Sequence, residues 1–481
     1  MDQSSQPLDE EAPAPPSAAA EQNGAAPNGL GIKPSETKAK KLKLIPLIFL
    51  IYFEVSGGPF GEEDAVRAAG PLLALLGFVI FPFIWSLPEA LVTAELATAY
   101  PGNGGYVVWA WAAFGPFWGF LMGWWKWISG VINNAAYPVL CLDYLKRVIP
   151  AFGHGPIRQA SICLYTLLLS YLNYTGLTIV GWTAVTLGVV SLLPFVFMFF
   201  WSIPRLKPSR WGVGPEGHKD WPLFFNTLFW NLNFWDNAST LAGEVERPQR
   251  TFPRALLCAG LLTCVGYIVP LLAATGALPL ERELWADGYL ADAAGHVAGS
   301  WLKFWIEVGA VLSTVGLFQA QLSSASFQLL GMSEIGLLPT LMAKRSSYNT
   351  PVLGILISAA GTLMLSYMNF EDIISAANFL YSCGMLLEFA AFLWLRRKFP
   401  TLNRPYRVPL RLPLLICFCT VPVAFLIYVM TLATLAVYML SLGVTVAGVG
   451  GYFLMRTAKR RNWIKFFLGA DGGIQSSGAG N

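Results

Sequence analysis

The chain has 481 residues, of which 55% are hydrophobic and 12% are charged. The apolar share exceeds that of an average soluble protein, and the charged share is about half of the usual value. This composition excludes an ordinary water-soluble domain. It indicates a protein that crosses a lipid bilayer several times and carries a formal net charge of only +4.

About twelve apolar runs are long enough to cross a bilayer as helices, for which roughly 20 residues are needed. We therefore expect an all-α polytopic membrane protein with a transporter-like transmembrane region over residues 43–456. Residues 1–42, rich in Ala, Pro, Gly, Ser, Gln and Glu, are expected to form a disordered cytoplasmic tail, and residues 457–481 a second cytoplasmic tail. The predicted spans are 44–66, 71–99, 113–145, 157–174, 177–203, 222–244, 252–275, 300–331, 351–368, 373–396, 412–434 and 436–456.

The first predicted span begins as an apolar helix and is interrupted by Ser56 to Gly61, SGGPFG. Proline lacks an amide hydrogen and the glycines favour open backbone, so the helix cannot continue there. Non-helical backbone at membrane depth is tolerated only where protein or a water-filled cavity satisfies its polar groups. The acidic Glu54 lies at the edge of this break, which is the profile of a substrate site.

The sixth predicted span, 222–244, is aromatic but carries a run of polar residues that includes Asn231, Asn233 and Asp236. We predict that it is unwound near Phe234 to Asn237. A single glycine- or proline-rich interruption is often only a kink or a close helix contact. Two interruptions at corresponding positions, each with an acid, indicate an inverted-repeat transporter with its site at the repeat interface.

The distribution of basic residues predicts that both termini are cytoplasmic. With the N-terminus inside, 21 of the 32 Lys and Arg fall in cytoplasmic segments, as the positive-inside rule requires. Lys126 and Lys303 lie within spans. Glu244 and the arginines that follow it are expected to form a cytoplasmic latch.

Four further carboxylates inside spans are functional candidates by their depth alone: Glu89, Glu95, Glu307 and Glu388.

The sequence gives no sign of catalytic or metal chemistry. All seven cysteines lie in apolar runs without a CxxC pair, so we expect buried free thiols. His154, His218 and His296 fall in outer loops without a paired nucleophile or metal-ligand spacing. We therefore expect no enzyme activity, no cofactor, no metal and no nucleic acid partner.

Several motifs resemble the amino acid, polyamine and organocation transporter (APC) superfamily. They are VSGGPFG in the first span, YPGNGGY at 100–106, GEVERPQRTFPRAL at 243–256, and GLLP at 336–339 followed by Thr350-Pro351. More narrowly, YFEVSGGPFG with FWNLNFWDNASTLAGEVERP is similar to the plant polyamine uptake transporters, a branch near the L-type amino acid exchangers. The resemblance implies a LeuT-type fold, which is a 5+5 inverted repeat plus two C-terminal helices, with helices 1 and 6 unwound.

The resemblance also implies a substrate site. The positions it assigns are Ser56, Gly57 and Gly58 on the first break, Asn134 on the third span, next to Asn133, and Trp230, Asn231, Asn233 and Asp236 on the sixth. Phe234 and Trp235 of the sixth span would add aromatic faces. A polyamine carries ammonium groups separated by methylenes, so its pocket needs anions and aromatic walls. Glu54 and Asp236 would be the anions, since no cationic residue of the first or sixth span is placed to neutralise them. The alternative for Asn133 and Asn134 is interhelical hydrogen bonding, and for the aromatics ordinary packing.

The expected function is import of polyamines (putrescine, spermidine and spermine) by proton symport with alternating access. The fifth span has no charged residue, so a proton carrier would have to be a carboxylate. The alternatives are a cationic or large neutral amino acid exchanger and, less favoured because the tails are short, a non-transporting sensor. The expected partners are a polyamine or related organic cation, protons and the lipid bilayer of the plasma membrane, with an endomembrane as the alternative. Cys163 lies inside the fourth span, so no disulfide-linked accessory subunit is expected.

Overall fold

The structure is a computed structural model that describes residues 41–213, 218–279, 281–286, 288–367 and 370–467. These residues are mostly helical, with two isolated β-bridges. The α-helices are α1 (Leu44–Val55), α2 (Glu63–Ala69), α3 (Pro71–Phe81), α4 (Leu87–Ala99), α5 (Tyr106–Phe114), α6 (Pro116–Val148), α7 (Gly155–Tyr174), α8 (Leu177–Ser202), α9 (Trp221–Asn231), α10 (Pro248–Ala277), α11 (Tyr289–Ala298), α12 (Ser300–Glu334), α13 (Val352–Leu365), α14 (Phe370–Lys398), α15 (Leu412–Thr431) and α16 (Leu435–Arg460). A π-helical turn, η1 (Pro82–Ser86), joins α3 to α4. The 3-10 helices are η2 (Pro150–Phe152), η3 (Ile203–Arg205), η4 (Pro208–Arg210), η5 (Asn237–Glu244), η6 (Arg282–Leu284) and η7 (Thr340–Ala343).

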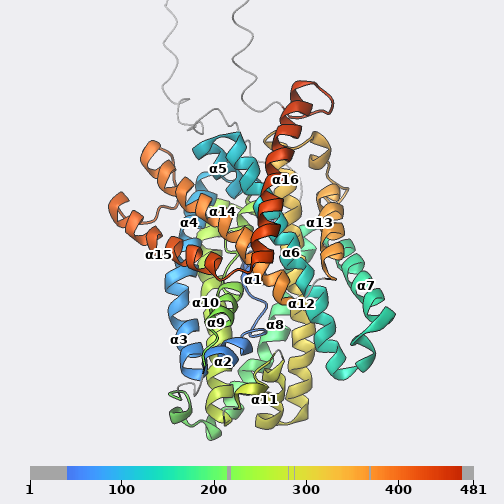
Figure 1. The fold of residues 1–481 in the computed structure, drawn as a ribbon, viewed down its shortest axis with the longest axis vertical. Coiled ribbons are helices and arrows are strands. Elements are labelled where there is room, and N and C mark those ends of the chain that lie inside the picture. Colours follow the sequence, from blue (N-terminus) through green and yellow to red (C-terminus); the bar gives the residue numbers. More distant parts are fainter. Residues whose placement is uncertain (1–40, 214–217, 280, 287, 368–369, 468–481) are drawn as a thin grey trace, which may run out of the picture.

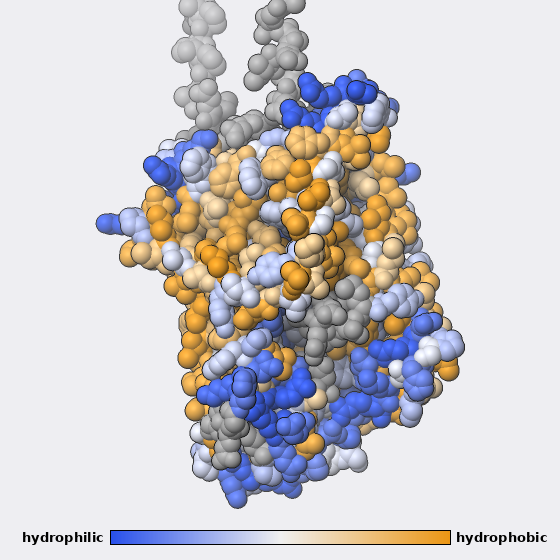
Figure 2. Space-filling model, in the orientation of Figure 1, coloured by the Kyte–Doolittle hydropathy of each residue, from blue (hydrophilic) through white to orange (hydrophobic). Residues whose placement is uncertain are grey.

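The helices form an elongated bundle whose long helices run in roughly the same direction (Figure 1). The long helix α12 packs against α1, α6, α8 and α11, and α6 packs in addition against α14. The short helices α2 and α11 lie at one end of the bundle, while α5 and the end of α16 lie at the other (Figure 1). Figure 2 shows a broad hydrophobic band on one face, with hydrophilic residues gathered at both ends, as expected for a protein embedded in a bilayer.

In the described part of the chain, seven helical segments are both long enough and apolar enough to cross a membrane. They are Pro71–Ala99, Leu177–Arg205, Pro248–Ala277, Ser300–Glu334, Ser375–Lys398, Leu412–Thr431 and Leu435–Arg460. The apolar helices α1 and α13 are shorter. Each of the twelve predicted spans coincides with a helix or an interrupted pair of helices, whereas α5 and α11 were not predicted, because neither is long enough to give a membrane-spanning apolar run.

Both predicted interruptions are present. Helix α1 ends at Val55, and helical structure resumes at Glu63. Helix α9 ends at Asn231, and the chain re-enters a helix only at Asn237, as the 3-10 helix η5. Between them Phe234 adopts a φ of 69°, a left-handed conformation that is uncommon for a residue other than glycine. The two breaks lie close together, since α1 packs against η5.

At the cytoplasmic end predicted from the charge pattern, Glu244 forms the expected latch with a different arginine. Its carboxylate lies 2.8 Å from Arg345, and it accepts a hydrogen bond of 2.9 Å from Asn103. The sequence suggested the arginines directly after Glu244, but the partner comes from the loop between α12 and α13. A backbone hydrogen bond of 2.8 Å from Leu42 to the Glu244 carbonyl ties the start of the chain to the same point.

The predicted tails lie largely outside the described residues, which exclude 1–40 and 468–481. Where residues near these tails are described, they are folded. Helix α16 continues to Arg460, and the Lys465 carbonyl accepts a hydrogen bond of 2.9 Å from the Thr340 amide. The folded region therefore extends somewhat beyond the predicted boundary at residue 456.

Candidate functional site

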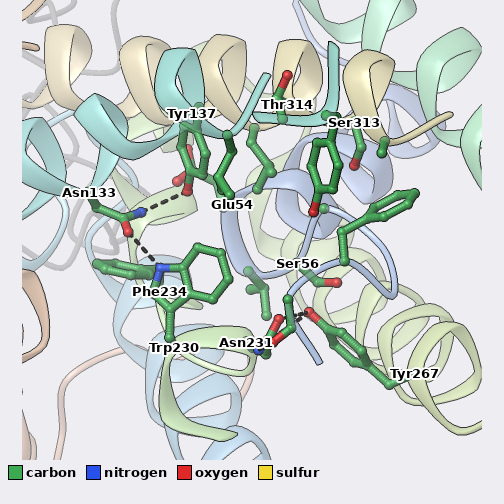
Figure 3. Close-up of a pocket in the computed structure, with 18 residues that line it drawn as sticks. Glu54, Ser56, Asn133, Tyr137, Trp230, Asn231, Phe234, Tyr267, Ser313 and Thr314 are labelled. Atoms are coloured by element: carbon green, nitrogen blue, oxygen red, sulfur yellow. Dashed lines mark hydrogen bonds between the residues drawn. The ribbon is translucent and has the colours of Figure 1, made fainter. Parts of the chain in front are cut away.

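A closed pocket lies between the two interrupted helices (Figure 3). Its walls come from the two breaks and from the facing surfaces of α6, α10 and α12. Among its lining residues, all in the described part of the chain, Glu54 is the one carboxylate and none is Lys, Arg or His. Its volume is about 20 Å³, room for a single water molecule. The pocket must therefore widen before it can hold an organic substrate.

Glu54 ends the helical part of the first span and is 1% exposed. Its carboxylate accepts hydrogen bonds from the Ser324 hydroxyl and, at 3.2 Å, from Asn237 Nδ2. Its backbone carbonyl accepts a third, at 3.0 Å, from Gln321 Nε2. These donors are neutral, and a buried carboxylate without a cationic partner carries a desolvation cost that a cation would offset. Glu54 is therefore positioned to pair with a positively charged ligand.

Trp230 separates the pocket from a larger vestibule. Its indole Nε1 donates a hydrogen bond of 2.9 Å to Asn133 Oδ1, and Asn133 Nδ2 donates one of 2.7 Å to the Tyr137 hydroxyl (Figure 3). The indole ring lies over Gly61, where an added Cβ would come within 2.8 Å of it and where φ is +85°. Both Trp230 and Gly61 line the pocket and the vestibule, which is the place that a gate would occupy.

The vestibule is a cleft of about 900 Å³ bordered by α2, α9 and the loop around η6. Its charged lining residues are mixed in sign: Asp64, Asp220, Glu283, Arg67 and Arg282. Asp64 lies 2.8 Å from Arg67, and Arg282 donates to backbone carbonyls of α2, including that of Ala68 at 2.6 Å. These contacts hold the rim of the vestibule together.

Other predicted residues complete the pocket wall. Ser56, Gly57, Asn231 and Phe234 all line it. The Tyr267 hydroxyl of α10 donates to the backbone carbonyl and to Oδ1 of Asn231, both at 3.0 Å. Asn231 Nδ2 donates to the Gly61 carbonyl at 3.3 Å. Residues of the second break thus hold the backbone of the first.

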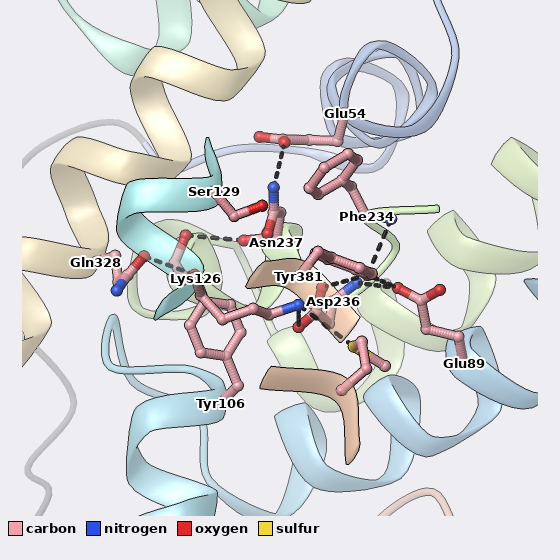
Figure 4. Close-up of polar contacts among 12 residues, drawn as sticks. Glu54, Glu89, Tyr106, Lys126, Ser129, Phe234, Asp236, Asn237, Gln328 and Tyr381 are labelled. Atoms are coloured by element: carbon pink, nitrogen blue, oxygen red, sulfur yellow. Dashed lines mark hydrogen bonds and ion pairs between the residues drawn. The ribbon is translucent and has the colours of Figure 1, made fainter. Parts of the chain in front are cut away.

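Asp236, the second predicted anion, does not line this pocket. Its Oδ2 lies 2.6 Å from Lys126 Nζ, and both side chains are fully buried. Figure 4 shows Lys126 reaching Asp236 from one side, while Glu54 lies beyond Phe234 and Asn237 on the other. The expectation of two unneutralised anions facing one cavity is therefore corrected for Asp236. The neutralising cation comes from α6, a helix that the reasoning about the first and sixth spans did not consider.

The sequence model of the family described as "Amino acid permease" matches residues 42–458 of the chain. The chain belongs to the amino acid permease family. It is accordingly an integral membrane protein of a family of permeases, not of enzymes.

Curated relatives of this permease match it over most of their length. It is 55% identical over 434 residues to an Arabidopsis thaliana protein named "Probable polyamine transporter", covering 90% of this chain and 88% of the relative. It is 53% identical over 429 residues to "Polyamine transporter RMV1" of Arabidopsis thaliana, covering 89% of this chain and 88% of the relative. It is 52% identical over 445 residues to "Polyamine transporter PUT1" of Oryza sativa subsp. japonica, covering 92% of this chain and 84% of the relative.

Besides Asp236, four predicted site residues of the permease lie outside the pocket lining: Gly58, Asn134, Asn233 and Trp235. Asn134 Nδ2 faces Thr362 of α13 at 3.5 Å, and Asn233 Nδ2 donates to Asn378 of α14 at 3.3 Å. Asn134 thus makes the interhelical contact that the sequence left as its alternative role, and Asn233, predicted to line the pocket, makes an interhelical contact as well.

Sequence reasoning missed the tyrosines that shape this region. Tyr137 and Tyr267 line the pocket, and Tyr381 of α14 lies against Phe234 with ring centroids 4.3 Å apart. The position of Tyr137 one helical turn after Asn133 was a usable signal, because residues four apart share a helix face. No local pattern marks Tyr267 or Tyr381 as a site residue, and only the packing of the helices reveals them.

Proposed function

We propose that this permease imports polyamines, with putrescine, spermidine and spermine as its substrates. The observation that carries the proposal is the buried carboxylate of Glu54 in a pocket walled by aromatic residues such as Trp230, Phe234 and Tyr137. An ammonium group of the substrate would pair with the carboxylate and make cation–π contacts with the aromatic rings. The methylenes of the substrate would pack against the faces of the same rings. The printed names of the relatives support the same substrate class.

We propose the site residues Glu54, Ser56, Gly57, Asn133, Trp230, Asn231 and Phe234 as those that contact the substrate, since all of them line the pocket. Gly58, Asn134, Asn233 and Trp235 would support this wall from behind. Asp236 would act through its ion pair with Lys126, which is taken up below.

Twelve transmembrane helices in a 5+5 inverted repeat, with two further helices, are the architecture that fits this site. Interrupted helices that meet near the membrane midplane are typical of such repeats. The pocket is closed, the vestibule lies on the Trp230 side, and the Glu244–Arg345 latch ties the opposite end. This arrangement is consistent with an occluded state that opens toward the vestibule and requires release of the latch to open inward.

Proton symport is the proposed coupling, with a buried carboxylate as proton carrier and both termini cytoplasmic in the plasma membrane. The membrane potential favours import independently, since each positive charge moved inward gains about 2.3 kcal/mol per 100 mV. A trivalent polyamine would gain about 7 kcal/mol from 100 mV before any proton is coupled.

A cationic or large neutral amino acid exchanger is the second candidate, because the matching family model describes amino acid permeases. Counterflow by the purified protein in liposomes separates the two, with labelled putrescine, spermidine, spermine, arginine and leucine as tracers. We expect exchange of the polyamines and weak exchange of leucine. Exchange of leucine or arginine without polyamine exchange would refute the proposal and favour the exchanger.

A further inference from the structure

The ammonium group of Lys126 lies in a cage built as an alkylammonium site. Its Nζ is 2.6 Å from Asp236 Oδ2, 3.4 Å from the centroid of the Tyr381 ring, 5.1 Å from that of Tyr106, and 3.3 Å from Met385 Sδ. A carboxylate combined with aromatic faces is the environment that binds organic ammonium ions. The protein has thus placed its own alkylammonium in the kind of site that a polyamine needs.

The cage contains more carboxyl groups than its single lysine can neutralise. Glu89 accepts a hydrogen bond from the Tyr381 hydroxyl, but its Oε2 has no hydrogen-bond partner in the described part of the chain. Glu388 lies beside Asp236, with which it shares a side-chain hydrogen bond, and it interacts electrostatically with Lys126. Both side chains are fully buried. Unsatisfied buried carboxyl oxygens are costly, and a cationic ligand would satisfy them.

Phe234 is the wall between this cage and the Glu54 pocket (Figure 4). Its ring contacts that of Tyr381, and its amide donates a hydrogen bond of 2.9 Å to the Tyr381 hydroxyl. Its φ of 69° falls where a side chain is strained. A strained residue in a non-helical segment can change conformation at lower cost than one inside a helix, and such a change would connect the Glu54 pocket to the cage.

We propose that the cage is a second ammonium subsite, which Lys126 occupies in the closed state and from which the distal ammonium of a polyamine displaces it. This inference rests on the proposed function, in which Glu54 binds the first ammonium. Lys126 is then a tethered competitor that neutralises the acidic cage when the carrier is empty. Because the second substrate ammonium must displace Lys126, the strength of the lysine's own contacts limits how strongly that ammonium is bound.

The chemistry of the lysine side chain matches that of the substrate. Four methylenes separate its Cα from its ammonium, the same number that separates the two nitrogens of putrescine. Gly384 leaves room for this chain, since a Cβ there would come within 2.6 Å of Lys126 Cδ. Removal of the chain beyond Cβ would therefore leave a channel with the dimensions of a propylammonium ion.

Chemical rescue tests the cage directly, without any transport. Lys126→Ala vacates the cage, and n-propylamine replaces the atoms that were removed. We expect the thermal unfolding temperature of this purified variant to rise with n-propylamine. The neutral isostere n-propanol should have no such effect. Lys126→Met is the matched control, because its side chain still fills the channel and should exclude the amine.

The outcomes decide whether the cage can bind a free alkylammonium ion. Folding of Lys126→Ala only when n-propylamine is present would support the subsite as well, because the amine then replaces the missing charge. Equal stabilisation of the alanine and methionine variants, or none for either, would overturn it. So would an alanine variant that fails to fold with and without the amine while Lys126→Met folds.

A transport measurement then connects the cage to the substrate. In competition for uptake, we expect Lys126→Ala to improve the apparent affinity for spermidine roughly tenfold, the equivalent of one charge-assisted hydrogen bond, and to leave that for n-butylamine unchanged. Equal changes in the apparent affinities for spermidine and n-butylamine would refute the displacement of Lys126 by substrate. If amine rescue succeeds but no polyamine is transported by the wild type, the proposed function fails while the alkylammonium cage stands.

Discussion

Replacement of Glu54 by glutamine removes the one carboxylate of the pocket with little change in shape. The glutamine amide retains a carbonyl oxygen for Asn237 Nδ2 and offers an NH₂ group to the Ser324 oxygen, so both neutral contacts of the wild type can be preserved. The variant should therefore fold. What it loses is the negative charge that would face a substrate ammonium.

The size of the loss follows from the kind of bond. A hydrogen bond to a charged group contributes about 1.5 to 3 kcal/mol, against about 1 kcal/mol for a neutral pair. Because Glu54 is buried and has no cationic partner among the described residues, desolvation of the unpaired ammonium adds to this difference. A total of about 2 kcal/mol corresponds to a loss of about 30-fold in apparent affinity.

Uptake of labelled spermidine and leucine into liposomes with an imposed inside-negative potential measures this loss. Spermidine uptake by Glu54→Gln should be weakened far more than leucine uptake. Glu307→Gln is the matched control, since Glu307 also lies in a membrane-spanning helix, α12, but does not line the pocket. Full spermidine transport by Glu54→Gln, or a loss equal to that of Glu307→Gln, would refute the assignment of Glu54 as the substrate anion.

Three further substitutions test other parts of the structure. Trp230→Ala should raise the apparent KM for spermidine well beyond the effect of Trp201→Ala, which removes a ring that is 52% exposed; equal effects would make Trp230 ordinary packing. Gly61→Ala should lower both uptake and the unfolding temperature, because its Cβ would meet the Trp230 ring at 2.8 Å in a backbone conformation that costs about 1 to 2 kcal/mol; wild-type values for both would contradict the close contact. Glu95→Gln should lower the free energy of unfolding by about 3 to 5 kcal/mol, because it removes the negative charge that pairs with the buried Arg396 at 2.7 and 2.6 Å and with Arg404 at 3.0 Å. Chemical denaturation measures this, and a second substitution, Arg396→Leu, should recover part of the loss; no recovery would argue against a pairwise interaction.

The sequence determined the features that depend on local backbone chemistry. The break after Val55 could be predicted because Pro59 and three glycines fall within six residues, a local concentration that disfavours a helix whatever surrounds it. The spans could be located because each requires a long apolar run. Trp230 could be placed at the pocket because it lies one helical turn before the second break.

Only the tertiary structure decided which side chains meet. Asp236 and Asn233 lie in the same short interruption, yet one pairs with Lys126 of α6 and the other bonds Asn378 of α14. Nothing local distinguishes their roles. The pairing depends on how α6 and α14 dock against the break, and docking is set by the shapes of many side chains far apart in sequence. For that reason the sequence could name the acids of this site, while only the packed bundle showed that Asp236 has a cation of its own and that Glu54 does not.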